Sequence, residues 1–214
     1  SGVFNGGGHT IEGLNVSLSD EQIKSAAEGL TGGLFGYVHG ATITNLTISG
    51  ASVTAKNYAG TLAAVLENTR VDGVYIEDAR VALDRWKAGT SGAAGLLAGA
   101  SIGTSEIINC ATAATDDTTD PERPVPALSA AQQTTGDAKA YNFVLGGLVG
   151  LNTAIIRNGY FTLDGTIAHC DTKDGIAGGL AGRNGNGGRI ENDSISPLPR
   201  AFESDSGLGA VRAG

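Results

Sequence analysis

The sequence predicts an all-β fold, a right-handed parallel β-helix (solenoid) of about five to six rungs with one short helical insertion. Three observations predict it. A glycine-leucine phrase recurs along the chain, a second phrase built on isoleucine and asparagine follows each copy, and the apolar runs between them alternate with period two. Repeats of this length with variable spacing are typical of a solenoid, in which each coil packs only on its neighbours.

The first phrase has a leucine at its centre and glycine or alanine around it. The five central residues are Leu34, Leu62, Leu97, Leu148 and Leu180, at steps of 28, 35, 51 and 32 residues. Unequal steps indicate a constant core interrupted by loops of different lengths.

The second phrase begins eight to ten residues after each leucine. Its first residues are Ile43, Val71, Ile107, Ile156 and Ile190. Two residues further on stand Asn45, Gly73, Asn109, Asn158 and Asn192. An incomplete copy, residues 11–14, precedes them and would place Gly13 in the asparagine position. Asparagine and glycine tolerate left-handed backbone, and stacked asparagines can hydrogen-bond along a ladder, so we expect a structural column here.

Strands are predicted between these landmarks. The runs 46–48 and 74–76 alternate apolar and polar residues, and each is bounded by Gly, Asn or Asp. A third position, nineteen residues after the central leucine, is aliphatic in three copies: Val53, Val81 and Ile167.

Three segments depart from the repeat within a chain that we interpret as one β-helix module, residues 1–214, from a larger protein. Residues 19–29 predict a short helix, with Ser19 as N-cap and Gln22 as its capping-box partner. The 51-residue step predicts a long loop insertion at 113–142. Residues 197–214 have lost the repeat and predict a cap or a tail.

Composition excludes several classes of function. The net charge of −8, without a dense basic cluster, argues against nucleic-acid binding. No apolar run approaches the ~20 residues of a membrane span. We expect no cofactor and no metal, because the three histidines lie far apart in sequence. Cys110 and Cys170 are expected to be small core residues, with a disulfide as the alternative.

Two phrases carry a resemblance to a known family. Gly-Gly-Leu-Val-Gly-Leu-Asn at 146–152 and Gly-Gly-Leu-Ala-Gly-Arg-Asn at 178–184, each followed by Ile-x-Asn, resemble the GLUG repeat of bacterial surface proteins. The opening segment 4–14 is similar to the start of such arrays, and the resemblance covers about residues 4–195. Such repeats occur in adhesins and in the N-terminal, non-catalytic region of immunoglobulin A zinc peptidases. The resemblance implies a β-helix in an extracellular, secreted or cell-surface-attached protein.

Ligand-binding residues are predicted on two segments. The first holds Arg85, Trp86 and Lys87, where an exposed Trp beside two cations could anchor a glycan or a protein. In the alternative interpretation Trp86 folds back over the edge of a rung. The second segment lies in the long insertion and holds Asp116, Asp117 and Arg123.

No catalytic motif is present in the sequence. The acids on the expected strands, Asp72, Glu77, Asp78 and Asp164, do not recur at one position of neighbouring rungs. The chain also lacks the His-Glu-x-x-His of a zinc peptidase.

The leading hypothesis is therefore a non-enzymatic extracellular module for adhesion or ligand presentation. Its expected partners are a host or neighbouring-cell protein or glycan, and other domains of the same parent chain. A substrate-positioning, non-catalytic region of a large secreted zinc peptidase is the first alternative. A polysaccharide lyase or hydrolase is the second.

Overall fold

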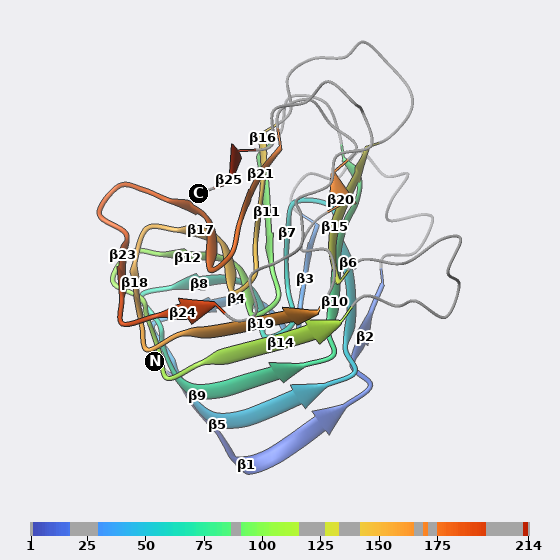
Figure 1. Ribbon diagram of the computed structural model, residues 1–214. Helices are drawn as coiled ribbons and strands as arrows, with labels where there is room; N and C mark the ends of the chain where they lie inside the picture. Colours follow the sequence, from blue (N-terminus) through green and yellow to red (C-terminus); the bar gives the residue numbers. More distant parts are fainter. Residues whose placement is uncertain are drawn as a thin grey trace.

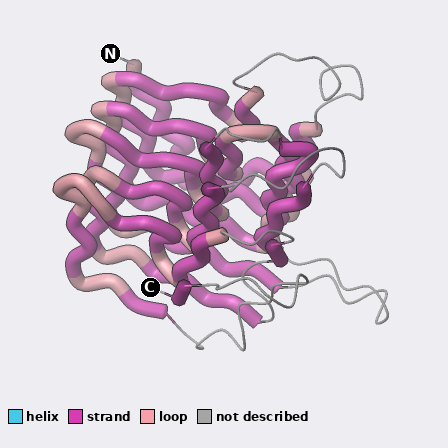
Figure 2. Tube along the Cα trace, turned by 90° about the horizontal axis from the view of Figure 1, so that it is seen from above, coloured by secondary structure: helices cyan, strands magenta, loops and turns pink. Residues whose placement is uncertain are grey.

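A computed structural model describes residues 2–17, 30–86, 91–115, 127–132, 142–164, 169–170, 175–195 and 212–213. Every regular element in these residues is a β-strand, and all strand pairs are parallel. The strands form four sheets, which we name the β9, β10, β11 and β12 sheets after the consecutive strands that they contain. Successive passes of the chain stack on one another, as Figure 2 shows.

The β9 sheet is the largest and lies at the front of Figure 1. It contains β1 (Val3–Glu12), β5 (Thr42–Ser49), β9 (Arg70–Glu77), β13 (Glu106–Ile108), β14 (Ala111–Thr115), β18 (Ile155–Arg157), β19 (Tyr160–Asp164), β23 (Arg189–Glu191) and β24 (Ser194–Ile195). The β10 sheet contains β2 (Asn15–Val16), β6 (Ser52–Ala55), β10 (Arg80–Trp86), β15 (Leu128–Gln132) and β20 (His169–Cys170).

The other two sheets meet at the leucine phrase. The β11 sheet contains β3 (Thr31–Gly32), β7 (Tyr58–Gly60), β11 (Ser91–Gly95), β16 (Asn142–Gly146), β21 (Ile176–Gly178) and β25 (Arg212–Ala213). The β12 sheet contains β4 (Phe35–His39), β8 (Ala63–Glu67), β12 (Ala98–Ile102), β17 (Val149–Asn152) and β22 (Ala181–Asn184). One rung passes through all four sheets, so the fold is a parallel β-helix of about five rungs, as predicted.

The two predicted columns are confirmed. Backbone hydrogen bonds of 2.9 to 3.0 Å link the leucine turns of successive rungs, from Phe35 N–H to the Leu62 carbonyl and on through Leu97 and Leu148 to Leu180. The isoleucine column pairs in register as Ile43, Val71, Ile107, Ile156 and Ile190. The first four of these side chains are at most 2% exposed, and they form part of a continuous aliphatic core.

The asparagine column has the predicted left-handed backbone. The φ angles are 53° at Asn45, 52° at Asn109, 54° at Asn158 and 57° at Asn192, and Gly73 fills the same position with a φ of 65°. At Asn109 the column separates β13 from β14, and at Asn158 it separates β18 from β19.

The prediction for Gly13 was wrong. Ile11 pairs with Ile48, and Phe4 occupies the position opposite Ile43. The register of β1 shifts between Asn5 and His9, where three consecutive glycines form a bulge. A Cβ at Gly6 would overlap the Asn45 carbonyl oxygen, so only glycine allows the two strands to approach this closely.

Small residues let the β11 and β12 sheets meet at the sharp turn near the middle of Figure 1. A Cβ added at Gly99 would lie 2.7 Å from the Ala64 carbonyl oxygen and 2.8 Å from the Ala93 carbonyl oxygen. A Cβ added at Gly150 would lie 2.7 Å from the Ala94 nitrogen. The glycines of the repeat are therefore required by close packing of backbone against backbone.

The segments that depart from the repeat are described only in part. The helix predicted at 19–29 and Ile167 lie outside the described residues. Part of the predicted loop 113–142 is strand β15, in which Leu128 pairs with Val81. Of the predicted cap or tail, β25 pairs with β21 at the edge of the β11 sheet. No helix in the described part of the chain is long and apolar enough to cross a membrane.

Candidate functional site

The structure places only two of the predicted ligand-binding residues. Arg85 and Trp86 end strand β10, and the backbone of Trp86 pairs with Gln132. The side chains of both, and residues Lys87, Asp116, Asp117 and Arg123 entirely, lie outside the described residues.

The two predicted segments join opposite ends of the β10 sheet. Residues 116–126 precede Leu128, which pairs with Val81 near the start of β10. Residues 87–90 follow Trp86, at the other end of this seven-residue strand. Seven residues of extended chain span about 20 Å. The structure therefore does not bring the attachment points of the two segments together.

A different set of polar side chains is ordered on the outward face of the β9 sheet. Asn158 Nδ2 donates to Asn109 Oδ1 at 3.0 Å, and Asn109 Nδ2 donates to Asp72 Oδ1 at 2.9 Å. Lower in the stack, Asn45 Nδ2 donates to Asn5 Oδ1 at 3.3 Å. The predicted asparagine ladder is thus formed, with Asp72 as the partner in the rung where the column has a glycine.

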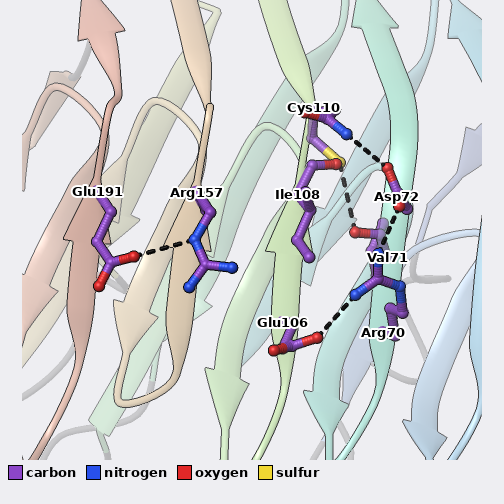
Figure 3. Close-up of polar contacts among 9 residues, drawn as sticks. Arg70, Val71, Asp72, Glu106, Ile108, Cys110, Arg157 and Glu191 are labelled. Carbon is purple, nitrogen blue, oxygen red and sulfur yellow. Dashed lines mark hydrogen bonds and ion pairs between the residues drawn. The ribbon is translucent and has the colours of Figure 1, made fainter.

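Ion pairs continue this order on the same face (Figure 3). Arg70 lies between two carboxylates, 2.7 Å from Asp72 and 2.8 Å from Glu106. Both raise the pKa of Arg70, the hydrogen bond to Asp72 most strongly. Because the groups are largely exposed, such pairs add little stability, and their main effect is to hold long side chains in place.

A second ion-pair cluster lies two rungs further on. Arg157 Nε lies 2.9 Å from Glu191, and Arg189 also pairs with this carboxylate. The hydrogen bond from Arg157, reinforced by Arg189, lowers the pKa of Glu191. Glu191 is therefore held between two arginines on this part of the face.

Cys110 lies beneath the ladder, in the core of the β-helix. It is a free, buried thiol whose sulfur lies 3.2 Å from the Ile108 carbonyl oxygen. Burial is the main cause that raises its pKa to about 12, so the thiolate is scarcely populated at neutral pH. Cys110 is a core residue, as expected, and the side chain of Cys170 lies outside the described residues.

Two exposed tyrosines stand beside the ladder. Tyr75 is 47% and Tyr160 is 42% exposed. Both pair in register with Ala111, so they share one outward column and lie two rungs apart, with the rung of Ala111 between them. Neither phenol has a hydrogen-bond partner within the described ranges. Sequence reasoning missed these residues, although each follows the asparagine position of its rung by two residues and so must face outward.

Acidic side chains and histidines are the groups that could supply catalysis or bind a metal. Asp72 and Glu77 lie in different columns of the β9 sheet, and Asp72 is engaged by Arg70 and Asn109. The described ranges hold no group of three or more His, Cys, Asp or Glu side chains that could bind a metal ion. His39 instead stacks on Tyr37 in the β12 sheet, at 6.5 Å between ring centroids.

Comparison with known proteins gives one solved structure of similar fold. It is named as a putative immunoglobulin A1 protease from Bacteroides ovatus, and it aligns at a TM-score of 0.54 with 16% sequence identity. The alignment covers 98% of this chain, which spans 64% of the length of that structure. No protein-family model and no curated protein sequence matches the chain. The structural likeness shows the fold of the chain over nearly its whole length.

Proposed function

We propose that this chain is a non-catalytic module of an extracellular protein, and that its β-helix presents a surface for adhesion or ligand binding. The observation that carries the proposal is the outward face of the β9 sheet. Its polar and aromatic side chains stand in columns set by the backbone register, and the Asn–Asp ladder and the ion pairs hold the polar side chains in place. A surface ordered before binding loses little conformational entropy when a partner arrives.

The extracellular setting rests on the resemblance of the repeats to the GLUG repeat. The expected partners are a protein or a glycan of a host or a neighbouring cell, together with other domains of the parent chain. Among the described strands, no two acids occupy one column on adjacent rungs, so this face does not favour polysaccharide cleavage.

A second candidate is favoured by the solved structure of similar fold. Because that structure is named as a putative immunoglobulin A1 protease, this chain could serve as the substrate-positioning region of a large secreted peptidase. The zinc-binding His-Glu-x-x-His would then belong to another part of such a protein, because the present sequence contains none.

A binding screen tests both candidates. The intact chain is screened against glycans and extracellular host proteins, including immunoglobulin A. Two variants accompany it: Trp86→Ala, and a replacement of residues 116–126 by a short Gly-Ser linker, which leaves β15 in place. Adhesion predicts specific binding to a surface glycan or protein, and substrate positioning predicts binding to immunoglobulin A.

The variants then locate the surface that binds. Loss of binding in either variant would assign it to the predicted segments, whereas retention in both would assign it to another part of the chain, such as the sheet faces. Absence of any binding by the folded chain would contradict a recognition function for the ligands tested and favour a spacer.

A further inference from the structure

We infer that Tyr75 and Tyr160 form a binding site for an extended, neutral, β-linked glycan, which lies across the strands of the β9 sheet along the stacking direction. The inference rests on the proposed binding function and names its ligand class. Both rings are about half exposed and neither phenol is engaged by another described residue. An exposed tyrosine offers a flat apolar ring for stacking together with a polar hydroxyl.

The spacing of the two rings suits a chain of sugars. Tyr75 and Tyr160 lie two rungs apart in one column, with Ala111 between them. At the usual strand separation, two rungs correspond to about 9 to 10 Å, a length that an extended disaccharide spans. In a β-1,4-linked chain, alternate sugars present the same face. The two tyrosines can therefore stack on two sugars that have one other sugar between them. The short side chain of Ala111 leaves room for that middle sugar.

Hydrogen-bonding groups flank both rings, as sugar hydroxyls require. On one side, two residues earlier in each rung, lie Gly73, Asn109 and Asn158, and the two asparagine amides are exposed. On the other side, two residues later, Glu77 is exposed and Thr162 is half-buried. Amide, carboxylate and hydroxyl groups beside an aromatic ring supply the donors and acceptors that orient a polar ligand.

The charge pattern favours a neutral ligand. The arginines of the ion-pair clusters on this face, Arg70 and Arg157, are already paired with carboxylates. Glu77, beside Tyr75, carries negative charge that would repel an anionic polysaccharide. A glycan without carboxylate or sulfate groups avoids this repulsion.

Tyr37 supplies a matched control. It is 58% exposed, but it lies in the β12 sheet, and its phenol donates to Glu67. Its column continues with Val65, Ala100, Leu151 and Arg183, so it has no second ring in line. Loss of Tyr37 removes a comparable exposed ring without touching the proposed site.

The test is affinity electrophoresis with soluble xylan, mixed-linkage β-glucan and hydroxyethylcellulose, with α-linked dextran as the control glycan. Dissociation constants for the best ligand follow by calorimetry. We expect the intact chain and Tyr37→Ala to bind a β-linked glycan. Tyr75→Ala and Tyr160→Ala should each bind roughly tenfold more weakly, and the double variant should not bind detectably. Since all three rings are exposed, thermal unfolding should show that every variant remains folded.

Three results would overturn the inference, and the first two separate it from the proposed function. Glycan binding that survives both substitutions would place the glycan elsewhere and leave the binding function intact. Binding of a protein ligand in the screen above, without binding of any β-linked glycan, would reject the ligand class while the binding function stands. If the folded chain binds none of the glycans or proteins tested, both the glycan inference and the proposed binding function are rejected for those ligands.

Discussion

Asn109 shows how one residue type meets two requirements of the repeat. Its backbone is left-handed, with a φ of 52°. Its amide donates to Asp72 at 2.9 Å and accepts from Asn158 at 3.0 Å, so it links three rungs. Glycine meets the first requirement alone, and most other residues meet neither.

The two requirements can be separated by substitution. Asn109→Gly keeps the backbone relaxed and loses the ladder, and we expect a loss of about 1 kcal/mol in the free energy of unfolding. Asn109→Ala loses the ladder and also strains the left-handed backbone, so we expect about 2 kcal/mol. Urea denaturation of the three proteins measures both values. Equal losses for Gly and Ala would show that backbone strain contributes nothing here.

Residue patterns predicted most of this column from the sequence. Asparagine and glycine recur two positions after an aliphatic residue, and that spacing was sufficient for the five complete copies of the second phrase. It failed at Gly13, because the bulge at Gly6, Gly7 and Gly8 shifts the register of β1. A bulge depends on how closely two backbones approach, and no single strand's pattern records that distance.

At the scale of elements, the turn between the β11 and β12 sheets is the most demanding part of each rung. The turn after Gly146 brings β16 and β17 so close that an added Cβ would overlap the Val149 carbonyl oxygen. The same Cβ would lie 2.6 Å from the Gly182 nitrogen. Since both neighbours are backbone atoms, they cannot move aside without breaking the pairing of the sheets.

Gly146→Ala should therefore lower the free energy of unfolding by about 3 kcal/mol or more. Gly185→Ala is the matched control, because nothing lies within 4 Å of the Cβ position at Gly185. We expect the control to change stability by less than about 1 kcal/mol. Thermal and urea unfolding of both variants measures the difference, and similar stability of the two would contradict the close packing.

Strands of alternating aliphatic residues were predictable, and β15 was not. Leu46, Ile48, Val74 and Ile76 alternate with polar residues, and their positions in β5 and β9 follow directly. The segment 127–132 contains mainly alanine, serine and glutamine, which have weak strand preferences. It forms a strand because β10 and β20 pair with it on both sides, a tertiary effect.

At the scale of the whole molecule, stability should vary along the stack. β9 has neighbours on both edges, β5 on one side and β13 with β14 on the other. β1 pairs only with β5 among the described strands, and Val3 is 80% exposed. In a solenoid each rung contacts only its neighbours, so a terminal rung has about half of the available contacts.

Hydrogen exchange should reveal this gradient. Amides of β9 and β13, around Val71 and Ile107, should exchange most slowly, and amides of β1 should exchange much faster. Exchange followed by mass spectrometry over minutes to hours measures both. Uniform protection across the rungs would indicate a single cooperative unit.

The site was less predictable than the fold. Repeats set the stacking order, and through it the column that holds Tyr75 and Tyr160. The sequence indicated instead Trp86, its single tryptophan, and the acids at 116–117 in the long insertion. A face made from three separate rungs has no local signature, because its members are 85 residues apart in the chain.

The shared register of β5, β9, β13, β18 and β23 also governs how such a body can change in length. Because neighbouring rungs align residue by residue, an insertion outside the loops preserves the columns only if it adds a complete coil. Each added coil would lengthen the body by about 4.8 Å and carry every distal column outward by that distance without changing its orientation. A partial coil inserted within the strands would shift the register and turn core residues toward solvent. The length of the stack therefore changes only in steps of one rung.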